Sequence, residues 1–261
     1  ELMVPALSLG GVGVGGLSTR VQEDEAIKGI QYAIEQGIDY IDTSPLYKES
    51  ERRIGIAIKG HPREKLILST KTGTHPDCWQ DYSWDGTMWT VENSLKLLGT
   101  DYIDLLLVHD PIEIDPVFAS RGALEALESL KEQGVIGSIG LGQRRHDYHK
   151  RAIESGRFDA ILTFADYQPT HTSALNELLP LAKKHDVGVL NGAVMAHGLL
   201  IGEDPDIVNA NLVSPRPEHQ VAPARKLYQF CQEKDIDMIA LVFQFCMRQE
   251  LINCTLTGAK N

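Results

Sequence analysis

The sequence is poor in cysteine and has no long apolar run. Its four cysteines lie far apart and form no Cys-x-x-Cys pair, which argues against a disulfide framework and a zinc knuckle. No stretch approaches the roughly 18 apolar residues of a membrane span. The first residues, Glu-Leu-Met-Val-Pro, carry neither the basic region nor the apolar core of a signal peptide. We therefore expect a cytoplasmic protein with reduced thiols and no membrane partner.

Basic residues are also scarce. The 261 residues include 25 Lys and Arg against 36 Asp and Glu, so the formal net charge is −11. Such a charge offers no bulk attraction to polyanions, and we expect a small-molecule substrate rather than a nucleic acid. No Pro/Ser-rich linker or change of composition divides the chain. Residues 1–261 are expected to form one domain, as a monomer or a small homo-oligomer.

Short runs of branched apolar residues alternate with amphipathic stretches along the chain, a pattern typical of βα units. Eight strands and about 250 residues favour an α/β fold of the closed (β/α)8 TIM-barrel type over an open doubly wound sheet with a second domain. Because only Thr257–Asn261 follow the last strand, we expect the final covering helix to be missing from this sequence. The predicted strands are Leu7–Val12, Ile38–Asp42, Leu66–Thr70, Asp104–Val108, Val135–Leu141, Asp159–Thr163, Val187–Asn191 and Ile252–Leu256.

Helical periodicity fills the intervals between these strands. Glycines at 37, 60, 99, 134 and 156 follow five of the periodic stretches, where a left-handed helix end is least costly. The predicted helices are Asp24–Gln36, Glu49–Lys59, Thr87–Leu98, Arg121–Gln133, Asp147–Ser155, Thr172–His185, Ala224–Glu233 and Met238–Gln249.

The glycine run from Gly11 to Gly16 satisfies the G-x-G-x-x-G pattern of dinucleotide-binding folds. In those folds a helix begins inside the motif, whereas helical periodicity here starts only after Glu23. We therefore interpret the run as a tight turn at the barrel mouth, where the bare backbone of Gly11 and Val12 approaches a ligand.

Four chemically reactive side chains fall near the carboxyl ends of three successive predicted strands. Asp42 and Tyr47 follow the second strand, Lys71 the third, and His109 the fourth. In a barrel of this type, these ends form the rim that carries the chemistry. A lysine beside a phenol lowers the phenol pKa, a carboxylate keeps the lysine charged, and an imidazole orients a substrate oxygen. These four side chains can transfer a proton to or from an oxygen atom, but none of them can donate or accept electrons. Redox chemistry at this site therefore needs a hydride carrier.

At these residues the chain resembles the aldo-keto reductases, nearest their aldose 1-dehydrogenase subgroup, which includes the L-fucose, L-galactose and D-threo-aldose enzymes. The resemblance implies Tyr47 as general acid/base, Lys71 as its pKa depressor, Asp42 as the partner of Lys71, and His109 as the substrate-orienting group. Lys48 stands where the family usually has glycine. The matching segments are Gly37-Ile-Asp-Tyr-Ile-Asp42-Thr-Ser-Pro-Leu-Tyr47-Lys-Glu-Ser-Glu51, Leu68-Ser-Thr-Lys71-Thr-Gly73 and Asp101-Tyr-Ile-Asp-Leu-Leu-Leu-Val-His109-Asp-Pro111.

The same resemblance implies NAD or NADP as cofactor. Gly142 and Gln143 stand where the family holds the nicotinamide carboxamide with Ser-Asn, and Asn191 follows the seventh strand. The last residues match the start of a loop that grips the adenosine phosphates. The residues that distinguish NAD from NADP are expected beyond the end of this sequence. The predicted cofactor contacts are Gly11, Val12, Gly142, Gln143, Asn191, Gly258, Lys260 and Asn261.

An aromatic, acidic loop after the third strand predicts a sugar-binding surface, in which Trp79, Trp84 and Asp110 contact the substrate. The expected reaction is hydride transfer between nicotinamide C4 and C1 of an aldose, giving a lactone, or a small aldehyde or ketone. Two alternatives stay open: a non-catalytic nicotinamide-binding regulatory subunit, and a metal-dependent barrel lyase or hydrolase. We expect no metal site at His146-x-x-His149, because no third ligand is near in sequence.

Overall fold

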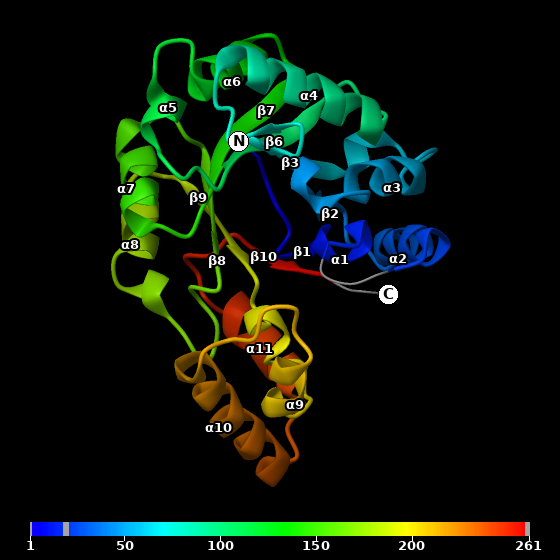
Figure 1. The fold of residues 1–261 in the computed structure, drawn as a ribbon, viewed down its shortest axis with the longest axis vertical. Helices are drawn as coiled ribbons and strands as arrows, with labels where there is room; N and C mark the ends of the chain where they lie inside the picture. The colour runs from blue at the N-terminus through cyan, green and yellow to red at the C-terminus, as the bar shows by residue number, and fades with distance from the viewer. Residues whose placement is uncertain (1, 18–20, 259–261) are drawn as a thin grey trace.

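Eight parallel strands close into a barrel in this computed structural model, which describes residues 2–17 and 21–258 (Figure 1). The order around the barrel is β1-β10-β9-β8-β7-β6-β3-β2, so each strand pairs with its neighbours in sequence and β10 returns to β1. The barrel prediction is confirmed. The strands are β1 (Leu7–Gly10), β2 (Tyr40–Asp42), β3 (Ile67–Thr72), β6 (Ile103–His109), β7 (Ile136–Gly142), β8 (Ala160–Phe164), β9 (Gly188–Gly192) and β10 (Cys254–Thr257).

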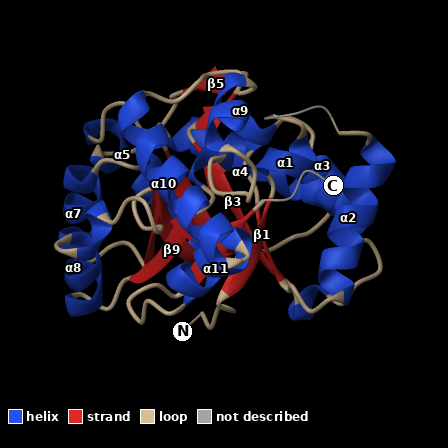
Figure 2. Ribbon diagram, turned by 90° about the horizontal axis from the view of Figure 1, so that it is seen from below, coloured by secondary structure: helices blue, strands red, loops and turns tan. Residues whose placement is uncertain are grey.

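Helices surround the strands (Figure 2). At the bottom of Figure 1, α9, α10 and α11 extend beyond the barrel and share an apolar cluster with the segment after β9. The longer helices are α2 (Glu23–Glu35), α3 (Ser50–Ala57), α4 (Trp84–Leu98), α6 (Ala123–Glu132), α7 (His146–Ser155), α8 (Leu178–Lys184), α10 (Glu218–Lys234) and α11 (Met238–Met247); α1 (Val12–Gly15), α5 (Asp115–Phe118) and α9 (Pro205–Ala210) are short.

Five of these helical segments end as the sequence predicts. The glycines at 37, 60, 99, 134 and 156 all have φ between +67° and +92°. The prediction of one helix over Thr172–His185 is wrong, because the stretch divides into a 3-10 turn (Ser173–Leu175) and α8. Pro180 lies in the first turn of α8 and has no N–H to donate to the preceding turn, so the helix cannot extend backwards through it.

The expected tight turn at Gly11–Gly16 is also wrong. The run forms the short helix α1, which ends at Gly16 with φ 80°. A Cβ on Gly15 would lie 2.0 Å from the Tyr47 carbonyl oxygen, and one on Gly11 would lie 2.4 Å from Ser50 Oγ. The glycines therefore let α1 pack tightly against the segment that follows β2, and the closed barrel excludes a Rossmann sheet.

The alternation of side chains along each strand determines which of them point into the barrel. The interior cluster includes Tyr40 on β2 and Leu105 and Leu107 on β6. Because side chains alternate with period 2, Asp42 points into the same interior as Tyr40, and His109 into the same interior as Leu107. Lys71 aligns with Leu107 across the β3–β6 pair. Three of the four predicted catalytic side chains thus meet at one end of the barrel.

Candidate active site

Tyr47 is held by a local turn after β2. Ser44 caps the 3-10 turn Pro45–Tyr47, its Oγ accepting a hydrogen bond from the Leu46 N–H at 3.2 Å. Lys48 then reverses the chain with φ 54° and ψ −113°, a conformation that L side chains rarely adopt. Its ammonium donates to the Gly16 carbonyl, which ties the turn to the end of α1.

Lys48→Gly should raise the free energy of unfolding by about 1 kcal/mol. The substitution removes backbone strain of about 1–3 kcal/mol at the entropic cost of a glycine in the unfolded chain. Lys48→Ala is the matched control, since it loses the same ammonium contact but keeps Cβ, and it should give no gain. Denaturant unfolding measures both variants; equal effects would show that φ at position 48 stores no strain.

A buried ion pair joins β2 and β3. Lys71 Nζ lies 2.9 and 2.8 Å from the two oxygens of Asp42 and donates to the Thr43 carbonyl at 2.6 Å. Ser69 Oγ donates to Asp42 Oδ1 at 2.7 Å. Burial is the largest single influence and opposes the charge on Lys71, but the Asp42 carboxylate and Tyr47 together outweigh it and raise the pKa of Lys71. The lysine therefore carries its positive charge at neutral pH.

The Tyr47 ring lies beside Lys71 and His109. Lys71 Nζ is 4.9 Å from the ring centroid, and the His109 ring meets Tyr47 edge-on with centroids 5.9 Å apart. Burial raises the pKa of Tyr47 above its ordinary value; Lys71 lowers it, and Asp42 raises it further. The expected net depression of this pKa by Lys71 is thus wrong, because burial outweighs the ammonium. Tyr47 is a neutral phenol at pH 7, ready to donate a proton.

His109 is a neutral imidazole with a defined orientation. Burial lowers its pKa well below the ordinary value, and the charge of Lys71 lowers it further. Its Nδ1 lies 2.6 Å from Thr74 Oγ1 and 3.2 Å from Ser44 Oγ. When the nearer hydroxyl, that of Thr74, donates to the lone pair of Nδ1, the ring proton resides on Nε2. The Nε2–H is then available to donate to a substrate oxygen beside the Tyr47 phenol.

Two glycines end strands at the rim. Gly142 ends β7 beside His109, and a Cβ there would meet no atom closer than 3.7 Å. Gly192 ends β9, which lies across the barrel from Lys71 on β3, but a Cβ there would lie 3.3 Å from Phe164 Cβ. Open space beside bare backbone is therefore found at Gly142 rather than at Gly192.

Two predicted cofactor contacts need correction. The Gln143 amide binds backbone instead: Nε2 donates to Pro111 O at 2.9 Å, and Oε1 accepts from Arg144 N at 2.7 Å. Asn191 is fully buried, shares the outward face of β9 with Val189, and donates to Tyr167 O. The Gln143 side chain thus stabilises the segment after β7, and the Asn191 side chain lies on the outer face of the barrel.

The other predicted cofactor residues divide into three groups. Gly11 is buried and serves helix packing, whereas Val12 is half-buried. Gly258 is exposed directly after β10. Lys260 and Asn261 lie outside the described residues. Contacts of Val12, Gly142 and Gly258 with a cofactor stay predictions.

The predicted substrate residues lie on different parts of the molecule. Trp79 is 54% exposed on the small hairpin of β4 (Thr74–His75) and β5 (Cys78–Trp79), the hairpin that also supplies Thr74 to His109. Trp84 begins α4 and packs against Arg121, whose guanidinium lies 5.6 Å from the ring centroid. Asp110 adjoins His109 at the rim, with Oδ2 3.6 Å from Nε2. The geometry favours Trp79 and Asp110 over Trp84 as substrate contacts.

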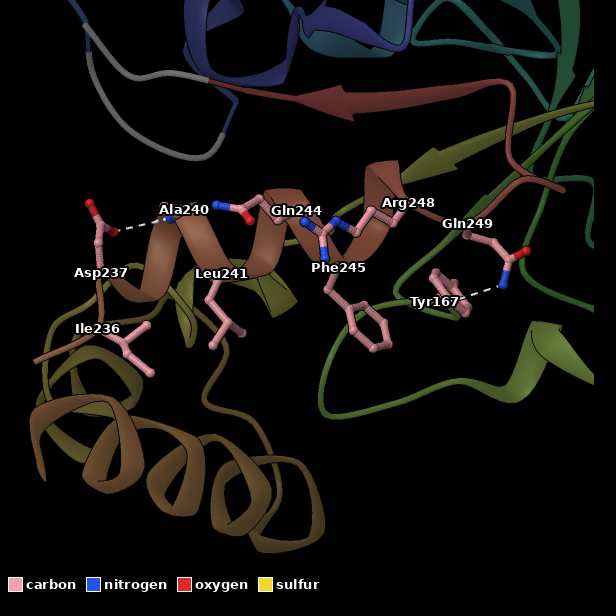
Figure 3. Close-up of a pocket in the computed structure, with 9 residues that line it drawn as sticks. All are labelled: Tyr167, Ile236, Asp237, Ala240, Leu241, Gln244, Phe245, Arg248 and Gln249. Carbon is pink, nitrogen blue, oxygen red and sulfur yellow. Dashed lines mark hydrogen bonds between the residues drawn. The ribbon is translucent and has the colours of Figure 1, made fainter. Parts of the chain in front are cut away.

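Other features of the described residues add no second site. No group of three or more possible metal ligands occurs among residues 2–17 and 21–258. His146 bonds Asp166 instead, and His149 bonds the Gln143 carbonyl. A groove of about 720 Å³ lies between α11 and Tyr167 and contains no residue of the rim (Figure 3). Within the same described part of the chain, no helix is long and apolar enough to cross a membrane.

The sequence profile of the Aldo/keto reductase family matches residues 6–261. The chain belongs to this family. It is similar to a D-threo-aldose 1-dehydrogenase from a Pseudomonas species, with 29% identity over 98% of this chain and 86% of the relative. It is also similar to an L-galactose dehydrogenase from Arabidopsis thaliana, with 29% identity over 98% and 81%. An aldo-keto reductase from Bacillus halodurans, solved in its holo form, superposes with a TM-score of 0.79 at 27% identity and covers 100% of this chain and 84% of its own.

These matches agree with the predicted family and with its aldose dehydrogenase-like subgroup. The chain is therefore an oxidoreductase of the aldo/keto reductase type, and the family points to nicotinamide cofactors in general.

Proposed function

We propose that the chain transfers hydride between C4 of a bound NAD or NADP and C1 of an aldose, giving a lactone, or the carbonyl carbon of a small aldehyde. One observation carries this proposal: a neutral phenol and a neutral imidazole converge beside a buried Lys71–Asp42 pair at the barrel rim. The names of the two aldose-oxidising relatives support the sugar as substrate.

Each rim residue has a separate task in this reaction. The cofactor, when bound, would supply or accept the hydride, and Gly142 leaves room for its ring. His109 Nε2–H donates to the reacting oxygen and fixes its position. In reduction, Tyr47 gives that oxygen its proton. Lys71 stabilises the phenolate that remains, and Asp42 holds Lys71 in place.

The raised pKa of Tyr47 gives the two directions different pH dependences. Reduction consumes the protonated phenol, so its rate should stay level across neutral pH and fall once the pH passes the Tyr47 pKa. Oxidation requires Tyr47 to accept a proton, so its rate should rise as the pH increases toward that pKa. Between pH 6 and pH 10, which lies below the raised pKa, the initial rate of reduction should stay level while that of oxidation rises; parallel profiles would contradict this.

The proposal is tested by recording nicotinamide absorbance with NAD, NADP and their reduced forms against a panel of aldoses and small aldehydes. We expect turnover that chelators leave unchanged. Turnover abolished by a chelator would indicate the metal-dependent alternative. Tight coenzyme binding without turnover of any panel member would indicate the regulatory subunit.

A further inference from the structure

Asp110 occupies a fixed and unusual position at the rim. It directly follows His109 and has a φ of +42°, a left-handed conformation that aspartate tolerates better than most residues. Its N–H donates to the Gly142 carbonyl at 2.8 Å, and its own carbonyl accepts from Gln80 Nε2 at 3.1 Å. Gln80 Oε1 accepts in turn from the Ile112 N–H. The backbone on both sides is thus pinned, and the carboxylate is held in place.

The two oxygens of this carboxylate have different surroundings. Oδ2 lies 3.6 Å from His109 Nε2, the atom that faces the reacting oxygen. Oδ1 is buried and has no hydrogen-bond partner among the described residues. The side chain as a whole is 39% exposed, so a ligand at the rim reaches the carboxylate through Oδ2 rather than Oδ1.

The geometry points to Asp110 as the residue that selects substrates with a hydroxyl on the carbon next to the reacting carbonyl. This inference rests on the proposed function. His109 Nε2 binds the carbonyl oxygen, and a hydroxyl on the adjacent carbon then comes within reach of the carboxylate beside Nε2. Asp110 Oδ2, the oxygen beside Nε2, accepts the hydrogen bond from that hydroxyl. In an aldose this group is the hydroxyl on C2, so the substrate class is 2-hydroxy aldehydes.

Charges around Asp110 support this role. Burial raises the pKa of Asp110 to about 6, and Lys71 acts in the opposite direction. The titratable groups that face it are His109 on β6, Lys71 on β3, Tyr47 after β2 and Tyr82 before α4. Above pH 6 the carboxylate is ionised and is the strongest acceptor for a hydroxyl. Below pH 6 it is protonated, so the preference for hydroxylated substrates should weaken.

The test compares kcat/KM for 2-hydroxypropanal and propanal, which differ by one hydroxyl. In Asp110→Ala the ratio of the two values should fall about 10- to 100-fold, the range for a hydrogen bond to a charged group. Propanal lacks the hydroxyl, so its value should fall less than the value for 2-hydroxypropanal. Asp77→Asn, which removes an exposed carboxylate on the β4–β5 hairpin, is the matched control and should leave the ratio unchanged.

A second variant guards against misfolding. Asp110→Asn keeps a side chain that tolerates positive φ and removes the charge of the partly buried carboxylate. The pKa of Asp110 is raised in the folded protein, so its ionisation opposes folding above pH 6, and this penalty disappears as the pH falls toward 4. Asp110→Asn should therefore raise Tm at pH 8 and have little effect near pH 4. A merely structural role would lower Tm.

The possible failures are distinguishable. If wild type turns over neither aldehyde with any nicotinamide coenzyme, the proposed function fails and the selectivity role fails with it. If wild type turns over both aldehydes but Asp110→Ala lowers kcat/KM equally for the two, or for neither of them, only the selectivity role is overturned. In wild type, a ratio of kcat/KM for 2-hydroxypropanal to kcat/KM for propanal that stays constant from pH 5 to pH 8 would likewise overturn the selectivity role.

Discussion

Replacing Tyr47 by phenylalanine should lower kcat by about 10²- to 10⁴-fold, the usual contribution of a positioned proton donor. The variant removes the hydroxyl that gives the reacting oxygen its proton, while the ring that contacts Lys71 and His109 remains. The dissociation constant for NAD(P)H should change less than threefold, because the bare backbone at Gly142 is untouched. Steady-state kinetics and quenching of protein fluorescence by the coenzyme measure the two quantities.

Tyr32→Phe is the control for this variant. Tyr32 is 62% exposed on α2, and its replacement by phenylalanine removes the same hydroxyl. It should behave as wild type. Turnover of Tyr47→Phe within tenfold of wild type would remove Tyr47 from the chemistry and with it the proposed mechanism.

The second large effect is on stability. Lys71→Met should lower the free energy of unfolding by about 3–5 kcal/mol, because it leaves the Asp42 carboxylate buried without its partner. Ser69 still donates to Asp42, but a single hydroxyl does not replace an ammonium that contacts both oxygens. Denaturant unfolding with linear extrapolation measures the loss.

A double variant separates charge from packing. Asp42→Asn combined with Lys71→Met removes both charges, and it should recover most of the stability lost in Lys71→Met. It should not recover activity, since Tyr47 then lacks the ammonium that stabilises its phenolate. A double variant as unstable as Lys71→Met would show that the pair contributes through packing rather than charge.

Most of the barrel was predictable because runs of branched apolar residues alternate regularly with amphipathic stretches. The eight strands appear within a few residues of their predicted bounds, from β1 (Leu7–Gly10) to β10 (Cys254–Thr257). Short helices were not predictable: α1, α5 and α9 have 4, 4 and 6 residues, too few for helical periodicity to emerge. The β4–β5 hairpin has two residues in each strand and leaves no alternation to detect.

At the candidate site, the sequence predicts which residues meet but not their environment. Asp42, Lys71 and His109 converge because strand ends of a parallel barrel share one rim, a rule that needs no coordinates. The pKa of Tyr47 depends on how deeply the ring is buried, which only the packed structure provides. Gln143 and Asn191 had the expected amide chemistry, but their hydrogen bonds to Pro111 and Tyr167 follow from loop geometry that spacing does not encode.

Deuterium transfer tests the central claim most directly. Wild type is supplied with NAD(P)H deuterated at the transferred C4 position and with 2-hydroxypropanal, and the product is analysed by mass spectrometry. One deuterium should appear on C1 of the product, the former carbonyl carbon. Tyr47→Phe at matched coenzyme occupancy should form at least about 100-fold less deuterated product in the same time. Product without deuterium, or deuterated product from Tyr47→Phe at the wild-type rate, would contradict hydride transfer coupled to proton donation by Tyr47.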